Sequence, residues 1–383
     1  MKKIKFTIAI PTFNRLSKLK KAIDSILSQK ISDQFEFNIA ISNTCSTDNT
    51  YDYLNKLKKK KEFFIHNEKK KVDKNVLSQF INFRNLAKII PADTDWVWWL
   101  GDDDYLYRKE SIQIVTEKIS ENTNNKNIPL FIHACHPDRA SSKGQCVTDS
   151  IMNLCEKFGY HEMLGWMSSI ILQKDAMIKV LNESTNNVNY LNSNNKEVAS
   201  CFAHSASILK NFHNKKGMFL DFGLVCNQDE KLTDDTKKRW ENDNVADRYF
   251  KIIDDFFEIR DVVKIKTFQK PFFRYHGYHI WDHLGEYLIR KAIIIGRKCI
   301  EEQRLVNTHE YELINNRWMK IVKIAQLLDD LETQKLLGFT FQSGLNYTNL
   351  YFNSLSEEVI NDFLLKFRQI LCITNYKKTI VNE

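Results

Sequence analysis

The sequence predicts an α/β protein in which helices flank a mostly parallel sheet, followed by an all-helical C-terminal extension. Two observations support this prediction. Up to about residue 110, short apolar runs of strand length alternate with longer segments whose apolar residues recur at helical spacing. Such strict alternation is typical of parallel strands joined by right-handed helical crossovers. The extension is predicted because no strand pattern appears after about residue 284.

Strands and helices are predicted in turn along the first part of the chain. The first strand covers residues 5–10, an apolar run that ends at Pro11. The next segment carries Leu19, Ile23 and Ile26 on one helical face. By the same reasoning, further strands are predicted at residues 35–41, 63–66 and 97–100, and further helices at residues 51–60 and 75–90.

The pattern weakens after residue 104 and becomes helical towards the C-terminus. Ser356 is a predicted N-cap of a closing helix, with Glu357 and Glu358 in its first turn. Strands are predicted at residues 128–134, 166–172 and 218–226, and helices near residues 112–119, 196–209, 284–304 and 309–337.

The composition is that of a large globular protein. The chain has 383 residues, 43% of them hydrophobic, which allows a sizeable core. No apolar run approaches the roughly 20 residues of a membrane span. Pro11 cuts the short N-terminal apolar run too early for a signal peptide. The eight cysteines show no CxxC pair or zinc spacing, as expected of reduced core thiols, so we expect a cytoplasmic protein.

Two lysine runs, at residues 58–61 and 69–71, contribute to the net charge of +8. Such runs are most often solvated loop faces. The second interpretation is contact with an anionic lipid surface or an anionic donor. Peripheral contact with the inner membrane is therefore an expectation, whereas no nucleic-acid partner is expected.

A buried strand that ends in clustered negative charge is the strongest site signal. The apolar run of residues 97–100 is followed by Gly101 and by Asp102, Asp103 and Asp104. Three adjacent carboxylates repel one another, so a structure that keeps them together usually supplies a cation. Carboxylate oxygens suit Mg²⁺ or Mn²⁺. The alternative is a solvated acidic turn that caps the next helix.

Glycine-rich phosphate loops are missing from the sequence. No GxGxxG follows the first predicted strand, and no GxxxxGK[ST] occurs. Their absence argues against a dinucleotide oxidoreductase and against a P-loop NTPase. A nucleotide could still be bound by polar side chains together with a metal.

Three segments together resemble a known family. Ile-Pro-Thr-Phe-Asn-Arg at residues 10–15, Ser-Thr-Asp-Asn-Thr at 46–50 and Leu-Gly-Asp-Asp-Asp at 100–104 resemble, in order and spacing, the nucleotide-binding half of family 2 glycosyltransferases with the GT-A fold. The resemblance covers about the first 110 residues. It implies a GT-A domain over residues 1–270, with a nucleotide-binding half (1–110) and an acceptor half (111–270), before a helical region (271–383).

The resemblance implies roles for polar residues at the strand ends. Pro11, Thr12 and Asn14 would line the uracil or ribose pocket, and Arg15 would close it. Relatives commonly carry an aspartate after the second strand, where this chain has Asn43, whose amide could still bond the uracil edge. Further contacts to the base and phosphates would come from Asp73, Lys74 and Asn75.

The same resemblance assigns the acidic cluster. Asp102 and Asp104 would be the DxD pair that holds Mn²⁺ or Mg²⁺, with Asp103 also in the donor site. Asp102 would face the ribose and sugar, whereas Asp104 would hold the metal that bridges the donor phosphates. A metal at this place stabilises the charge of the leaving nucleoside diphosphate.

The general base is not decided by the sequence. Relatives place a carboxylate at the start of a helix in the acceptor half, and Glu197 fits that location. Its alternative is a first-turn glutamate that the helix dipole favours. His204 is a second candidate, although a lone helical histidine is more often structural. Asp234 and Asp235 are weaker candidates.

Three histidines occur at short spacing near residue 280. His276, His279 and His283 would share one face of a helix, but Gly277 and Pro271 argue against a continuous helix. One of them could reach the metal or diphosphate, as in some GT-A enzymes. The interpretation that we favour is an aromatic packing junction. A zinc site is less expected, since no cysteine lies nearby.

The resulting hypothesis is a metal-dependent inverting glycosyltransferase. It would move a sugar from a UDP-sugar to a saccharide or lipid-linked saccharide acceptor in bacterial capsule, O-antigen or lipooligosaccharide synthesis. The alternatives are a nucleotidyltransferase or another nucleotide-sugar enzyme, and a degenerate scaffold. The C-terminal helices could also mediate homo-oligomerisation.

Overall fold

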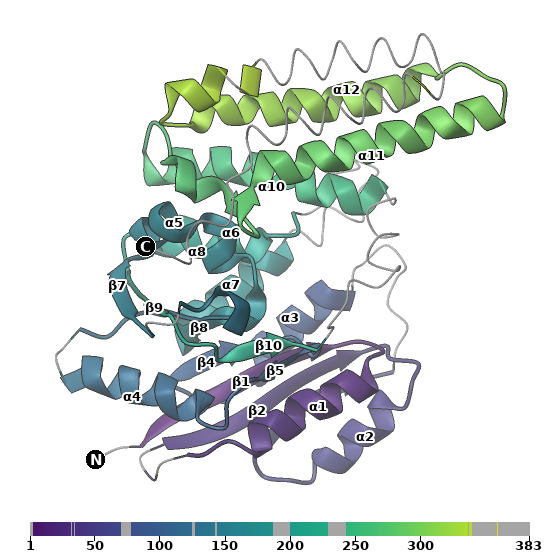
Figure 1. Cartoon of the computed structure of the whole chain (residues 1–383). Coiled ribbons are helices and arrows are strands. Elements are labelled where there is room, and N and C mark those ends of the chain that lie inside the picture. The colour runs from purple at the N-terminus through teal and green to yellow at the C-terminus, as the bar shows by residue number, and fades with distance from the viewer. Residues whose placement is uncertain are drawn as a thin grey trace. The chain divides into compact units, whose positions relative to one another are not determined.

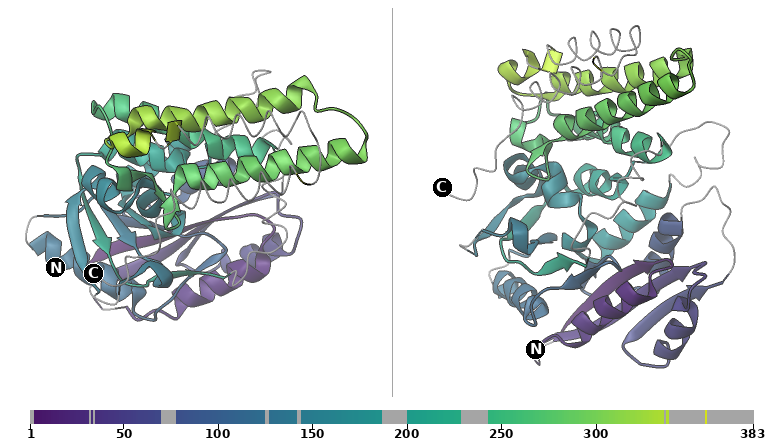
Figure 2. Two further views of the ribbon diagram at one scale, coloured as in Figure 1. Left: turned by 45° about the horizontal axis from the view of Figure 1, so that its top comes forward. Right: turned by 45° about the vertical axis from the view of Figure 1, so that its right-hand side comes forward.

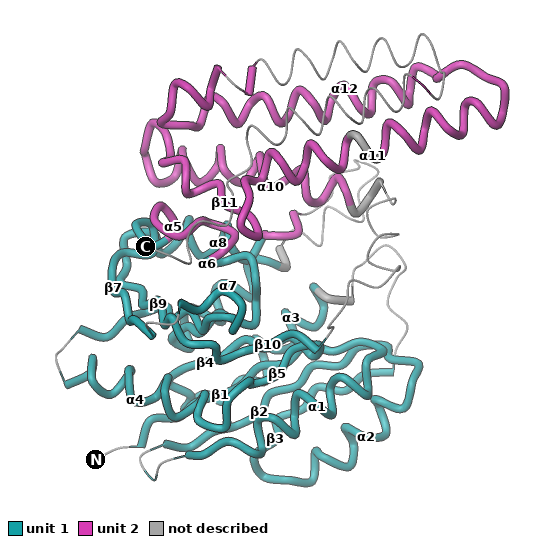
Figure 3. Tube along the Cα trace, in the orientation of Figure 1, with its two compact units in different colours: residues 1–154, 163–199, 203–232 teal, residues 155–162, 200–202, 233–383 magenta. Residues whose placement is uncertain are grey.

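The computed structural model describes residues 3–31, 33, 35–69, 78–124, 127–141, 144–186, 200–228, 243–335, 337–338 and 358. The chain divides into two compact units, which Figure 3 colours separately. Unit 1 consists of residues 1–154, 163–199 and 203–232, and unit 2 of residues 155–162, 200–202 and 233–383. The domain boundary at residue 270 stays a prediction.

Within the described residues, eight strands form the central sheet of unit 1, in the order β3-β2-β1-β4-β8-β6-β9-β7 (Figure 1). The four strands predicted from the first hundred residues pair in parallel, β1 with β2 and β4, and β2 with β3. By contrast, β8 runs antiparallel to its neighbours β4 and β6. The predicted fold class, a mostly parallel sheet flanked by helices, is confirmed. The strands are β1 Ile4–Thr12, β2 Phe35–Thr44, β3 Phe63–Glu68, β4 Trp96–Trp99, β6 Phe131–Ala134, β7 Cys146–Ser150, β8 Ile170–Gln173 and β9 Lys216–Leu220.

The tryptophan strand β4 packs on both faces of the sheet, because side chains alternate along a strand. On one face, Trp98 meets Phe6 edge to face at 6.2 Å, in a core that also takes in side chains of α1, α2 and α4. On the other face, Trp99 meets Phe83 of α3 at 4.6 Å and His204 of α8 at 5.4 Å. Figures 1 and 2 show helices on both sides of the sheet. The helices are α1 Leu16–Leu27, α2 Thr50–Leu57, α3 Ser78–Ile89, α4 Ser111–Asn124, α5 Ile151–Phe158, α6 Tyr160–Leu164, α7 Lys174–Asn186 and α8 Ala203–Phe212.

A two-stranded antiparallel sheet follows directly after the acidic turn. Strand β5, Asp104–Leu106, pairs with β10, Val225–Asn227, so that Asp104 lies opposite Asn227. The amide of the next residue, Gln228, donates to the Asp103 carbonyl at 2.9 Å. The Gln228 side chain donates to the Asp104 carbonyl at 3.3 Å. The backbone of the acidic turn is therefore held from a segment more than a hundred residues away.

Unit 2 is built mainly of helices, as the extension was predicted to be. Arg317 is buried and donates to Asp247 at 2.7 Å and to the Tyr287 hydroxyl at 3.3 Å, which links α12, α10 and α11. Phe268 stacks on Phe272 at 4.1 Å beside these helices. The elements are α10 Asp243–Val263, η4 Lys270–Phe273, β11 Arg274–Tyr275, β12 Tyr278–His279, α11 Ile280–Glu301, α12 Thr308–Lys323 and η5 Ile324–Leu327.

Several element predictions differ from the structure. The predicted strand at 166–172 begins as a 3-10 turn, η2 Met167–Ser169, because the Ser169 amide and hydroxyl both donate to the Trp166 carbonyl. The predicted strand at 218–226 is two strands, separated by a turn in which Gly223 approaches Pro137 too closely for a Cβ.

The C-terminal predictions differ mainly in their limits. The helix predicted at 309–337 ends at Lys323 and continues as η5. The histidines near residue 280 do not share a helical face, because β11 and β12 form a hairpin and α11 begins after His279. Of the closing helix after Ser356, only Glu358 lies within the described residues. Among the described helices, none combines the length and apolarity needed to cross a membrane.

Candidate active site

The ends of two neighbouring strands bring together residues ninety positions apart in the sequence. β1 and β4 are parallel neighbours, so their carboxyl ends meet at one edge of the sheet. There the Thr12 hydroxyl donates to the Asp102 carboxylate at 2.7 Å. Arg15 donates to Asp102 at 2.9 Å and to Asp103 at 2.8 Å. The structure thus joins the first and third segments of the family resemblance.

Asp104 is the most constrained carboxylate of the cluster. It is only 3% exposed. Its Oδ2 accepts hydrogen bonds from the Trp166 indole at 3.0 Å and from the Ser168 hydroxyl. Its Oδ1 is buried and has no hydrogen-bond partner among the described residues. Burial, with a smaller contribution from the charge of Asp103, raises the pKa of Asp104 to about 7.

Gly101 allows the carboxylates to gather around Ser168. A Cβ at this position would lie 2.9 Å from an Asp103 oxygen, 3.1 Å from an Asp104 oxygen and 3.2 Å from the Ser168 hydroxyl. The Gly101 amide itself donates to that hydroxyl at 2.8 Å. A larger residue at this position would push the acidic turn away from Ser168.

The acidic cluster fits a divalent cation. Mg²⁺ and Mn²⁺ are bound by one or two protein carboxylates together with water and phosphate oxygens. The buried, unpartnered Oδ1 of Asp104 is a ready oxygen ligand, and Asp102 could supply a second. Burial also raises the pKa of Asp102, although Arg15 opposes this shift. A cation would favour the charged form of both carboxylates.

The predicted base pocket is already internally hydrogen-bonded. Asn43 is fully buried; its amide nitrogen donates to Asn67 at 2.8 Å, and its oxygen accepts from Ser46. Asn14 has a φ of 53°, and its side chain accepts from the Thr47 amide at 2.6 Å. The structure therefore joins the first and second segments of the resemblance. A contact between Asn43 and a base stays a prediction, as does the lining role of Pro11.

Asn82 is a positioning residue that the sequence analysis missed. It lies on α3, is 1% exposed, and accepts from Ser42 at 2.9 Å and from Thr44 at 2.8 Å. Its amide nitrogen donates to the Thr12 carbonyl at 2.9 Å. One side chain thus ties the ends of β1 and β2 together. The same helix also carries Arg84, Asn85 and Lys88, so Asn82 does not stand out in the sequence.

Of the two candidates for the general base, the structure describes only His204. Glu197 lies outside the described residues, as do Asp73, Lys74 and Asn75. His204 is buried against the Trp99 ring, and burial lowers its pKa to about 4. An imidazole with so low a pKa is a weak base, and its burial keeps it away from solvent. Its catalytic role stays a prediction.

A hollow of about 690 Å³ lies elsewhere on unit 1. It is lined by Ile4 and Trp96, which begin β1 and β4, and by Lys174. Ligands of parallel sheets bind at the opposite, carboxyl ends of the strands. The acidic cluster is therefore the better candidate site despite this hollow.

The mostly parallel sheet flanked by helices agrees with the GT-A fold that the resemblance implies. Residues 7–166 match the family model described as glycosyl transferase family 2, and they contain all three segments of the resemblance. The resemblance to family 2 glycosyltransferases is thus confirmed over residues 7–166, and it supports the predicted enzyme class, a glycosyltransferase.

Solved structures of glycosyltransferases are also similar to the chain. S. aureus TarS 1–349 in complex with UDP-GlcNAc is 12% identical with a TM-score of 0.48, over 96% of this chain and 92% of that one. Mannosyltransferase PcManGT from Pyrobaculum calidifontis, in complex with GDP-Man and Mn²⁺, is 11% identical with a TM-score of 0.43, over 96% and 87%. Similarities this low carry no conclusion about donor or metal. No curated protein matches the sequence.

The pKa of Asp104 predicts a pH-dependent stability. A carboxyl group whose pKa is higher in the folded protein adds stability that is complete below its ordinary pKa, about 4, and is lost as the pH rises through about 7. Asp104→Asn can still accept from Trp166 and Ser168 but cannot ionise. In metal-free protein, the free energy of unfolding of Asp104→Asn relative to that of the wild type should therefore rise by about 1 to 3 kcal/mol from pH 5 to pH 7.

Urea unfolding of both proteins at pH 5, 7 and 8 measures this difference. The matched control is Asp24→Asn, which removes an exposed carboxylate from α1 and should shift little. A stability difference between Asp104→Asn and the wild type that does not change with pH would contradict the assigned pKa.

Proposed function

We propose that the protein is a metal-dependent, inverting glycosyltransferase that transfers a sugar from a UDP-sugar to a saccharide acceptor. The observation that carries the proposal is the Asp104 carboxylate, buried with one oxygen unpartnered among the described residues. It lies at the carboxyl end of the central strand, inside the family 2 match. A buried carboxylate without a partner is costly unless a ligand or proton compensates it.

Binding of the donor is proposed at the shared ends of β1, β2 and β4. Thr12 and Asn43 would face the nucleoside, and Arg15 carries a charge suited to the diphosphate. Arg15 is held by Asp102 and Asp103, so its guanidinium is oriented before a donor arrives. Asp102 and Asp104 would hold a divalent ion, whose chemistry is to stabilise negative charge on the leaving diphosphate.

The proposed transfer is a direct displacement. The acceptor hydroxyl oxygen forms a bond to the anomeric carbon while the bond from that carbon to the diphosphate oxygen breaks. The hydroxyl proton passes to a base of the protein, and UDP leaves with the bonding electrons. One displacement inverts the anomeric configuration. Glu197 is the proposed base, because the low pKa of His204 makes that residue weak in this role.

Synthesis of a bacterial capsule, O-antigen or lipooligosaccharide is the proposed context, in the cytoplasm and with peripheral contact to the inner membrane. A lipid-linked saccharide is the corresponding acceptor. Of the alternatives, a nucleotidyltransferase is disfavoured by the family match. A degenerate scaffold is disfavoured by the hydrogen-bonded acidic cluster, whose partners Trp166 and Ser168 position Asp104 closely.

Metal dependence is tested by nucleotide release from a panel of UDP-, GDP- and ADP-linked sugars with Mn²⁺ or Mg²⁺. We expect turnover with a UDP-sugar, loss of turnover in EDTA, and at least about a 100-fold lower kcat in Asp104→Asn, because a ligand charge is removed. Asp24→Asn serves as control. Full activity in EDTA would contradict metal dependence, and turnover only with another nucleotide would contradict the uridine donor.

Base selectivity is tested by thermal unfolding with UDP, GDP or ADP at equal concentration and with Mn²⁺ present. A ligand that binds only the folded state raises the melting temperature, and at equal concentration the ligand with the lower dissociation constant gives the larger rise, because the stabilisation grows with the logarithm of [L]/Kd. We expect UDP to give the largest rise, and Asn43→Ala to remove much of its advantage. Equal rises for the three nucleotides would argue against a uracil pocket.

The base is tested with Glu197→Gln, which keeps the size of the side chain but accepts no proton at neutral pH. We expect a loss of about 10²- to 10⁴-fold in kcat with donor binding preserved. His204→Phe, which keeps a buried ring beside Trp99, should retain most activity. The reverse outcome would assign the base to His204. A product with the donor's anomeric configuration would rule out the single displacement.

A further inference from the structure

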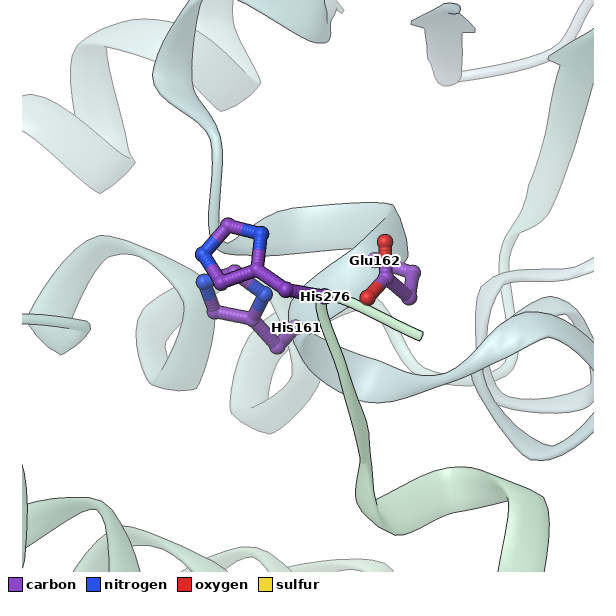
Figure 4. Close-up of side chains that lie close together, drawn as sticks. All are labelled: His161, Glu162 and His276. Carbon is purple, nitrogen blue, oxygen red and sulfur yellow. The ribbon is translucent and has the colours of Figure 1, made fainter. Parts of the chain in front are cut away.

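Two histidines and a glutamate of unit 2 converge far along the chain from the acidic cluster. His161 and Glu162 are consecutive on α6, and His276 is at the turn between β11 and β12 (Figure 4). One ligand atom from each lies within 4.8 Å of the other two. Among the residues that the structure describes, no other three histidine, cysteine or acidic side chains come so close together.

The hairpin presents His276 through an unusual backbone conformation. Tyr275 pairs with Tyr278, and the two residues between them, His276 and Gly277, have φ values of 49° and 80°. Two consecutive left-handed residues are typical of a tight type I′ hairpin turn, in which asparagine followed by glycine is favoured. A histidine with positive φ is less common than asparagine or glycine and suggests a use for its ring.

Contacts on both segments hold the three side chains in place. The His161 ring lies 3.9 Å from the Tyr275 ring and 4.6 Å from the His276 ring, centroid to centroid. The Gly277 amide donates to a Glu162 oxygen at 3.3 Å, so the turn is tied to the same carboxylate. His161 is buried, whereas His276 is exposed. The cluster is therefore both positioned and open to solvent on one side.

We propose that His161, Glu162 and His276 form a zinc site. Two imidazoles and one carboxylate are a ligand set that Zn²⁺ uses with a water molecule in the fourth position. This ligand set needs no cysteine, so the lack of a cysteine in residues 274–283 does not weigh against the site. Mg²⁺ prefers oxygen ligands alone and suits the aspartate cluster of unit 1 better. The two clusters therefore have different metal preferences.

The zinc ion would fasten the hairpin to α6. His161 and His276 are 115 positions apart, and the ion would join their segments through bonds to both imidazoles. Because metal binding to a folded site is linked to folding, occupancy should stabilise unit 2. The proposal does not depend on the sugar-transfer reaction.

The test uses the tag-free full chain, stripped with a chelator and titrated with Zn²⁺ by calorimetry. We expect one tightly bound Zn²⁺ per chain in the wild type and in Asp104→Asn, a variant that lacks the proposed aspartate ligand of the other cluster. His276→Asn keeps a residue that favours the left-handed turn, and Glu162→Gln keeps an oxygen that can accept from Gly277. Each should weaken the tight equivalent by at least about 100-fold, because a ligand is lost. His309→Asn, on the exposed start of α12, is the matched control.

Co²⁺ substitution gives a second measurement, since a tetrahedral site gives an intense visible absorption that an octahedral oxygen site lacks. We expect this absorption in Asp104→Asn and its loss in His276→Asn, with circular dichroism unchanged. The proposal is overturned if no tight equivalent binds, if His276→Asn and Glu162→Gln bind zinc like the wild type, or if only Asp104→Asn loses it.

Discussion

A carboxylate as deeply buried as that of Asp104 must be protonated, be hydrogen-bonded throughout or face a cation. Two donors, Trp166 and Ser168, satisfy one of its oxygens, and the other has no partner among the described residues. The raised pKa, about 7, reflects this incomplete compensation. Because one buried oxygen of Asp104 has no partner among the described residues, this carboxylate is suited to bind a cation. Trp166 and Ser168 hold it in that position.

That environment depends on the direction of one strand. Because β8 runs antiparallel to β4, the residues that precede β8 lie at the carboxyl end of β4. Trp166 and Ser168 are in this preceding segment, so they reach Asp104 across 62 and 64 positions of sequence. The Trp98 indole donates to the Ser168 carbonyl at 2.8 Å and fixes the same segment from within the core. The segment that Trp98 holds in the core is thus the same segment that positions Asp104.

The two units present metal-ligand sets of different hardness. Unit 1 offers carboxylate oxygens, which match Mg²⁺ or Mn²⁺ and the phosphates of a donor. Unit 2 offers imidazole nitrogens with one carboxylate, which match Zn²⁺. Each of the two proposed sites would therefore select its ion by the type of its ligand atoms. It also explains why experiments on metal dependence have to vary the two clusters separately.

The sequence by itself determined the strand and helix alternation of the first hundred residues, because apolar periodicity reports local structure directly. It also contained the acidic run, and the resemblance to family 2 glycosyltransferases grouped Thr12, Arg15 and Asp102, which hydrogen bonds bring together in the structure. It could not indicate Asn82, Trp166 or Ser168 as partners, since their bonds span 38 to 70 positions and follow from strand order. The contact of His161 with His276 likewise depends on how a hairpin packs on α6. Tertiary structure decided these contacts because side-chain hydrogen bonds between distant segments leave no periodic trace in the sequence.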